Sequence, residues 1–390
     1  MIDYTKALSH KAQNLKPSGI RKFFDMLSGK EGIISLTVGQ PDFATPWHIR
    51  DAGIDSIADG HTFYTSNRGT PEMRDELVKY MKRRFNLSYC AETELLVTVG
   101  ASEAIDLAIR ATVDADDEVI VPIPSFVCYE PLVQMAGGKV VCVETTEEDG
   151  FKLTPEKLRS AITEKTKLIV LPYPSNPTGA ILTKEELEAL AKVILETNAI
   201  VLSDEIYAEL TYGCRHTSIA TVEGMKERTI VVNGFSKAYA MTGWRLGFSA
   251  APEPITEAMF KIHQFGVMCA PTVSQFAATE ALRNGDSDIE MMRDEYDRRR
   301  KYLVRALCDI DLPCTQPDGA FYVFIKVGHH GLSSEEFCEK LLEEQQVAIV
   351  PGNAFGECGE GYARISYAYS LEHLKEAVKR MDRFVKSLKK

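Results

Sequence analysis

Short apolar runs rich in β-branched residues recur between residues 95 and 250, at 95–99, 118–122, 139–144, 167–172, 199–204, 229–233 and 245–250. Helix-like stretches separate them, for example 101–113, 126–136 and 183–197, and Thr183 and Glu186 form a capping box at the start of the third. Near-continuous apolar strands that alternate with helices are typical of a mainly parallel sheet covered on both faces. We therefore predict an α/β fold with a seven-stranded sheet.

The pattern changes after about residue 285. A highly charged helix over 289–307 is followed by three strands and an amphipathic helix, predicted at 321–327, 348–350, 363–367 and 371–388. The stretch before Trp47 lacks the parallel-sheet rhythm. We predict a large domain over 46–285 and a smaller α+β domain built from 1–45 and 286–390.

Composition narrows the class of protein. The 390 residues are 45% hydrophobic and 26% charged, as in ordinary globular proteins, and the net charge of −11 argues against a nucleic-acid partner. No run approaches the roughly 20 apolar residues of a membrane span, and the first residues lack the pattern of a signal peptide. The nine cysteines are scattered singly, which favours reduced thiols in a cytoplasmic protein over disulfides or a zinc site.

Polar residues follow several of the predicted strands, and ligands of open parallel sheets bind at these carboxyl ends. Small residues at 100–103 expose backbone N–H groups that suit a phosphate, although many such turns are simply small. Asp204 follows the strand at 199–202, where it could cap a helix or meet a ligand. Lys237 follows the strand at 229–233; a desolvated amine there could serve as a Schiff-base nucleophile, and Arg245 could hold a phosphate.

Four segments carry a resemblance to a known family: Ser-Asn-Pro-Thr-Gly at 175–179, Ser-Asp-Glu-Ile-Tyr at 203–207, Phe-Ser-Lys at 235–237 and Thr-Gly-Trp-Arg-Leu-Gly at 242–247. The chain resembles the fold-type I pyridoxal-phosphate enzymes, specifically the class I/II aminotransferases. Outlying segments at 39–43, 64–71 and 364–367 match as well, so the resemblance covers essentially the whole chain. It implies pyridoxal 5′-phosphate as cofactor and amino-group transfer as activity.

The resemblance also implies roles around the cofactor ring. Lys237 would form the Schiff base and move the proton between the reacting carbons. Asp204 would pair with the pyridine nitrogen, and Tyr207 and Asn176 would bond the 3′ oxygen. Phe126 matches the aromatic residue that stacks on the ring.

The phosphate and the substrate would be held by a further set of residues. The resemblance assigns the phosphate to Ala101, Ser102, Ser236 and Arg245, with Gly234 at a position where some relatives have another serine. Tyr64 matches a tyrosine that reaches the phosphate of a neighbouring subunit, which implies a homodimer. Arg364 would bind the α-carboxylate of an amino acid or 2-oxo acid, with Asn176 and the backbone of Gly39 beside it. Arg21 could meet a distal carboxylate, but we favour a solvated helix charge there.

Alternatives remain open at this stage. A carbon–sulfur β-lyase shares nearly every cofactor residue, and a non-catalytic cofactor-sensing module shares the fold. Among transaminase substrates we prefer a dicarboxylic or aromatic donor with 2-oxoglutarate as acceptor. His329 and His330 lie between two glycines with no carboxylate at ligand spacing in the sequence, so we predict a solvated loop and no metal.

Overall fold

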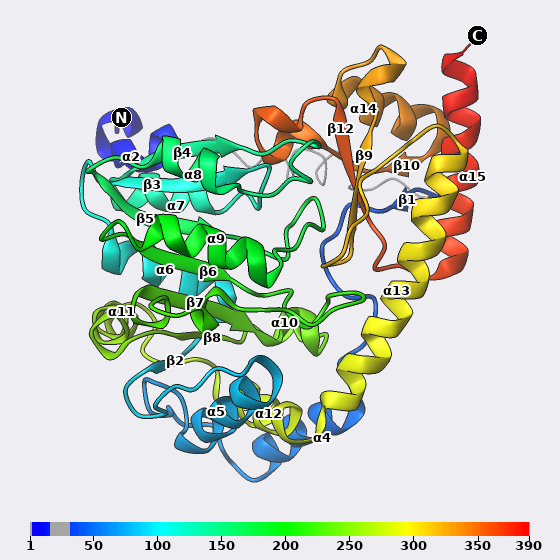
Figure 1. Ribbon diagram of the computed structural model, residues 1–390. Helices are drawn as coiled ribbons and strands as arrows, with labels where there is room; N and C mark the ends of the chain where they lie inside the picture. Colours follow the sequence, from blue (N-terminus) through cyan, green and yellow to red (C-terminus); the bar gives the residue numbers. More distant parts are fainter. Residues whose placement is uncertain (1, 16–31, 390) are drawn as a thin grey trace.

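The computed structural model describes residues 2–15 and 32–389 (Figure 1). Its largest sheet has seven strands in the order β2-β8-β7-β6-β5-β3-β4. These strands are β2 (Leu95–Thr98), β3 (Glu118–Ile123), β4 (Lys139–Glu144), β5 (Thr166–Leu171), β6 (Ile200–Asp204), β7 (Thr229–Gly234) and β8 (Gly247–Ala250). Strand β8 pairs antiparallel with both neighbours, while β7, β6, β5, β3 and β4 pair in parallel. The predicted mainly parallel sheet is therefore confirmed.

Both faces of this sheet are buried. In β5, Leu168 and Val170 pack into a cluster with α6 (Gly100–Thr112) and α11 (Glu253–Gly266), whereas Ile169 packs on the opposite side. That opposite cluster includes residues of α8 (Pro155–Ala161) and α9 (Lys184–Ile194). Because successive strand residues point to opposite faces, a strand buried on both sides is apolar throughout. The predicted capping box opens α9, with both of its hydrogen bonds formed.

A second unit lies at the other end of the molecule (Figure 1). It contains the antiparallel sheet β11-β12-β9 and the parallel pair β1-β10. Its elements are β1 (Ile34–Ser35), α13 (Asp286–Asp309), β9 (Tyr322–Lys326), α14 (Ser334–Gln345), β10 (Val347–Ala348), β11 (Val350–Pro351), β12 (Tyr362–Ser366) and α15 (Leu371–Leu388). The pairing of β1 with β10 brings residues 34 and 35 of the early chain to this smaller α+β unit.

The remaining elements flank the large sheet or belong to the smaller unit. They are α1 (Tyr4–Ala7), α2 (His10–Asn14), α4 (Trp47–Ala58), α5 (Pro71–Phe85), α7 (Tyr129–Ala136), α10 (Phe235–Ala238), α12 (Thr272–Asn284), η1 (Ile219–Thr221), η2 (Lys226–Arg228), η3 (Thr242–Trp244), η4 (Gly328–His330), η5 (Gly352–Phe355) and η6 (Glu357–Gly359). Helix α2 lies against α7, where Lys11 Nζ donates to the carbonyl of Met135. This part of the segment 1–45, predicted for the smaller domain, therefore packs against a helix of the large-sheet layer. The domain boundaries at 46 and 285 remain a prediction. Within the described residues, every helix is too short or too polar to cross a membrane.

Candidate active site

A cavity of about 360 Å³ lies where β5, β6 and β7 end. Parallel strands leave their carboxyl ends at one edge of the sheet, which is where ligands of such folds bind. The predicted residues that line the cavity are Gly39, Ala101, Ser102, Phe126, Asn176, Asp204, Tyr207, Ser236, Lys237, Arg245 and Arg364. Tyr64 lies elsewhere, with 80% of its surface exposed. Arg21 falls outside the described residues.

Lys237 enters the cavity from α10, the single helical turn that follows β7. Its Nζ donates to the carbonyl oxygen of Gly39 at 2.5 Å. Loss of bulk water, followed by repulsion from Arg364 and Arg245, lowers the pKa of this amine to about 8, while Asp204 acts in the opposite direction. An amine with this pKa is partly uncharged near neutral pH, so it can act as a nucleophile or base.

Asp204 is the last residue of β6 and is buried. Its Oδ2 accepts a hydrogen bond from Tyr129 Oη at 2.7 Å, and its Oδ1 accepts one from the backbone of Ile206 at 3.2 Å. Burial raises the pKa of the carboxyl group, although both hydrogen bonds oppose this. The side chain thus makes the capping-type bond considered from the sequence, and it also lines the cavity. Its partner Tyr129 was missed, because nothing local connects α7 with β6.

Arg364 projects from β12 and is 3% exposed. Its Nη1 donates to Asn176 Oδ1 at 2.8 Å and its Nη2 donates to the carbonyl of Thr37 at 2.5 Å. The guanidinium lies 4.5 Å from the ring centroid of Tyr322, and burial lowers its pKa. Its Nε is buried without a partner among the described residues. A buried donor without an acceptor is unfavourable, so this group is suited to an anionic ligand.

Two tyrosines complete this side of the cavity. Tyr207 Oη and Tyr322 Oη lie 2.8 Å apart, and both rings are buried. A Cβ at Gly39 would overlap the hydroxyl of Tyr322, so only glycine allows this close approach. Sequence reasoning predicted Tyr207 and Gly39 but missed Tyr322, which β9 brings in from the smaller unit.

The start of α6 forms an anion-binding region with Arg245. Gly100 has a φ of +76°, and a Cβ there would lie 2.7 Å from Arg245 Nη2. A Cβ on Gly247 would lie 2.5 Å from the backbone nitrogen of Ala101. Glycines at both positions therefore let a guanidinium and the positive end of α6 come together, beside Ser102.

A buried histidine supports the start of α6. His263 of α11 is 0% exposed, and its Nδ1 lies 2.7 Å from Glu103 Oε1. The other oxygen of Glu103 accepts from the backbone of Val99, and His263 Nε2 lies 2.9 Å from the carbonyl oxygen of Asn67. The histidine thus connects the anion-binding turn with the loop that carries Tyr64. The sequence contains no local signal for it, since Glu103 and His263 are 160 residues apart.

Comparison with known proteins agrees with this geometry. The profile of the family described as "Aminotransferase class I and II" matches residues 31–381. A Bacillus subtilis protein named as an aminotransferase, YugH, is 54% identical, covering 98% of this chain and 99% of that protein. The aspartate aminotransferase of Pyrococcus abyssi is 45% identical, with the same two coverages.

A solved structure extends the likeness to three dimensions. The aromatic aminotransferase from Pyrococcus horikoshii OT3 superimposes with a TM-score of 0.90 at 44% identity, covering 95% of this chain and 99% of that one. The fold is therefore that of the fold-type I aminotransferases. Family profile, whole-length relatives and structure agree that this chain is an aminotransferase and belongs to the class I and II family.

Proposed function

We propose that this aminotransferase holds pyridoxal 5′-phosphate in the cavity at the sheet edge, attached through Lys237. The observation that carries the proposal is the amine of Lys237, whose pKa of about 8 sets it apart from an ordinary lysine. The remaining cavity residues fit such a group. The turn at Gly100 with Arg245 suits a phosphate, and Phe126 offers an aromatic face.

When bound, the cofactor supplies an electron-withdrawing ring that stabilises negative charge on the substrate carbon. Asp204 would hold a proton on the ring nitrogen, and Tyr129 keeps its Oδ2 in place. Tyr207 and Asn176 would donate to the ring oxygen. Lys237 Nζ would take the proton from the substrate α-carbon and deliver it to the cofactor carbon on the other side of the shared nitrogen, because this amine lines the same cavity as Asp204 and Tyr207.

Arg364 would bind the substrate α-carboxylate. Its Nε has no partner among the described residues, and the ring of Tyr322 limits the planes in which the guanidinium can lie. A planar two-point contact fixes both the position and the orientation of a carboxylate. Asn176 and the backbone of Gly39, which already contact Arg364 and Lys237, would border the same subsite.

The cavity lining favours an apolar side chain on the donor. Its cationic residues are Lys237, Arg245 and Arg364, and each has a role above. None of the described lining remains to pair with a distal carboxylate, whereas Ile105, Phe126 and Ile206 add apolar surface. We therefore favour an aromatic or other apolar donor over a dicarboxylic one. A dicarboxylic acceptor such as 2-oxoglutarate would need a cation from elsewhere.

We infer that the protein works as a homodimer with shared sites. Tyr64 and Phe63 are 80% and 81% exposed, although their loop is anchored by Thr272 Oγ1, which donates to the carbonyl of Phe63 at 2.7 Å. Exposed aromatics on an ordered loop suit a subunit contact. A cytoplasmic location stays a prediction, supported by the nine cysteines, all of which are free thiols.

The cofactor and the reaction can be tested by absorbance. Addition of pyridoxal phosphate should give the band of a lysine-linked cofactor, and an amino acid should convert it to the pyridoxamine band. A 2-oxo acid should then restore the first band, with aromatic donors faster than aspartate. Release of pyruvate and ammonia from cystathionine, without such cycling, would instead identify a β-lyase. Absence of any lysine-linked band would refute the assignment of Lys237.

The shared site can be tested by mixing inactive variants. Lys237→Ala and Tyr64→Ala chains are refolded together, so that mixed dimers form. If Tyr64 serves the partner's site, each mixed dimer contains one site with both residues, and activity returns. Activity that stays at the level of the separate variants would contradict the shared site.

A further inference from the structure

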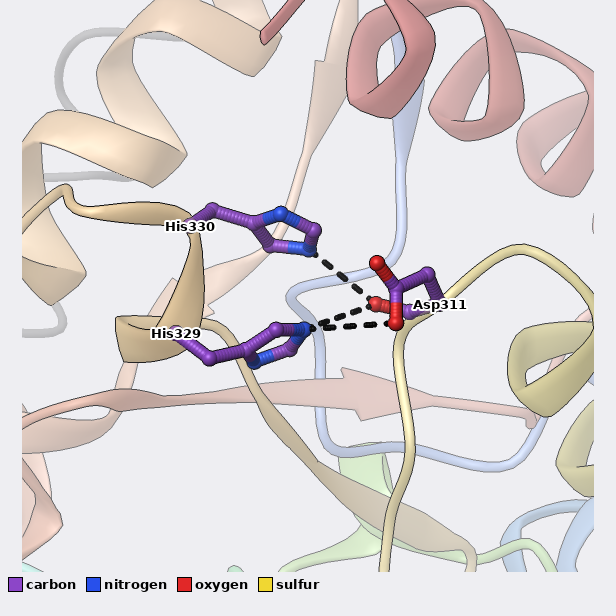
Figure 2. Close-up of side chains that lie close together, drawn as sticks. All are labelled: Asp311, His329 and His330. Carbon is purple, nitrogen blue, oxygen red and sulfur yellow. Dashed lines mark hydrogen bonds and ion pairs between the residues drawn. The ribbon is translucent and has the colours of Figure 1, made fainter. Parts of the chain in front are cut away.

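Two histidines and an aspartate come together at the surface of the smaller unit. His329 and His330 form the η4 turn directly after β9, and Asp311 follows the end of α13 (Figure 2). The Nε2 atoms of His329 and His330 lie 3.1 and 3.0 Å from the carbonyl oxygen of Asp311. His329 Nε2 is also 3.6 Å from Asp311 Oδ1. The loop is solvated, as predicted, but the fold supplies the carboxylate that the local sequence lacks.

Backbone hydrogen bonds hold the two segments in place. Lys326 N donates to the carbonyl of Pro313 at 2.8 Å, which joins the end of β9 to the segment after Asp311. The η4 turn closes with a bond from His330 N to the carbonyl of Val327 at 3.1 Å. The ring nitrogens therefore converge on Asp311 because the backbone positions them. Such preorganisation lowers the free energy needed to assemble a ligand site.

The spacing suits a small metal ion. The three side-chain donor atoms all lie within 4.8 Å of one another. Tetrahedral coordination with bonds of about 2.1 Å requires ligand atoms about 3.4 Å apart. Rotation of the histidine side chains can supply the difference, since His329 is exposed and His330 half-buried. The exposed side leaves room for a water as fourth ligand.

The chemistry of the donors selects the kind of ion. Imidazole nitrogens with one carboxylate oxygen suit Zn²⁺, Ni²⁺ and Cu²⁺ better than Mg²⁺ or Ca²⁺. Lys389 Nζ lies 2.8 Å from Asp311 Oδ2, so the lysine occupies one carboxylate oxygen and leaves Oδ1 toward His329. Lys389 caps α15. The site thus joins the ends of α13 and α15 to the η4 turn.

We propose that Asp311, His329 and His330 bind a divalent transition-metal ion that prefers imidazole ligands, and that this ion clamps the end of α13 to the η4 turn. The site lies outside the cavity described above and does not depend on its function. The ion would act on the stability of the smaller unit. Zn²⁺ is the probe for this proposal.

Binding is tested by competition with a chromophoric zinc chelator, using metal-stripped protein that retains its cofactor. Wild type should bind one Zn²⁺ per chain more than His329→Gln/His330→Gln, and Asp311→Asn should weaken this binding about tenfold. The matched control is His10→Gln/His373→Gln, which removes two exposed histidines from α2 and α15 and should behave as wild type. All cysteines remain in every variant, so zinc held by thiols cancels in the comparison. Equal stoichiometry and affinity in wild type and His329→Gln/His330→Gln would overturn the proposal.

The clamp is tested by unfolding with and without Zn²⁺. At a free ion concentration of about 100 times Kd, the folded-to-unfolded ratio should rise about 100-fold in wild type and in the control. The histidine pair variant should show no such rise relative to its own stability without metal. Binding that leaves wild-type unfolding unchanged would refute the clamp. Loss of the rise in the control would refute the assignment of the site.

Discussion

The candidate active-site cavity and a cluster that α5 forms with Glu209 both hold charged groups away from water, but only the cluster pairs opposite charges with each other. In the cluster, Glu209 Oε1 accepts from Tyr80 Oη at 2.8 Å and from Arg84 Nε at 2.9 Å. Glu209 Oε2 accepts from Arg84 Nη2 at 2.6 Å. Burial alone would lower the pKa of Arg84, but the bonds and charge of Glu209 outweigh it and raise that pKa.

The cavity shows the opposite arrangement. Lys237 and Arg364 both contact backbone carbonyls, and Asp204 contacts a hydroxyl and an N–H. No ion pair joins these three residues to one another or to any other part of the chain that the structure describes. Burial lowers the pKa of Lys237 and of Arg364. Loss of one partner from a buried ion pair destabilises the fold, whereas charges left without a counter-ion remain available to a ligand.

Replacement of the cavity lysine should have the largest effect. Lys237→Ala removes the proposed nucleophile and proton carrier, so the rate of amino transfer should fall on the order of 10⁴-fold or more. The fold should persist, because no ion pair is lost. Stopped-flow absorbance gives the rate and thermal unfolding gives the stability. Lys261→Ala, at an exposed position in α11, is the control. Wild-type turnover in Lys237→Ala would contradict the assignment of Lys237 as nucleophile and proton carrier.

In the paired cluster we expect a loss of stability instead. Arg84→Met leaves Glu209 buried and charged, so the free energy of unfolding should fall by about 3 kcal/mol. Urea unfolding at fixed protein and cofactor concentration measures this free energy. As the control, Arg110→Met breaks an exposed ion pair with Asp106 and should change the free energy of unfolding by about 0.5 kcal/mol or less. A similar loss in both variants would mean that burial of the pair is irrelevant.

Replacement of Tyr129, the hydrogen-bond partner of Asp204, should have a smaller effect on catalysis. Tyr129→Phe removes one hydrogen bond to a buried carboxylate, worth about 1.5 kcal/mol, and kcat should fall about tenfold. Because Arg364 is untouched, KM should change little. Tyr302→Phe removes a hydroxyl from a half-buried residue of α13 outside the cavity lining and should leave kcat unchanged. A large rise in KM with unchanged kcat would show that Tyr129 acts on substrate binding instead.

The mildest test uses pH. In cofactor-free protein, the rate of pyridoxal phosphate attachment should rise about tenfold per pH unit below 8 and level off above it, as Lys237 loses its proton. The lowered pKa also has a consequence for stability. Between pH 8 and the ordinary lysine value of 10.5, the unfolded chain binds more protons at this residue, so its contribution to stability rises with pH there. A rate that continues to rise to pH 10 would show that Lys237 titrates as an exposed lysine.

Most of the fold could be predicted because its signals are local. The seven strands of the large sheet lie within two residues of their predicted bounds, since each run is apolar on both faces. The short pieces β10 and β11 are separate elements in different sheets, where a single strand at 348–350 was predicted. At two residues each, such strands carry too little pattern to be told apart.

The sequence by itself determined the residues to which we assign the chemistry. Lys237, Asp204 and Asn176 stand at strand ends or in rigid turns, where backbone and side chain are specified within a few residues. Only the tertiary structure decided which side chains these residues contact. Tyr129 meets Asp204 across 75 residues, and Asp311 meets His329 through the pairing of β9 with the segment after α13. The physical reason is that such distances depend on strand order and packing, which no local stretch of chain encodes.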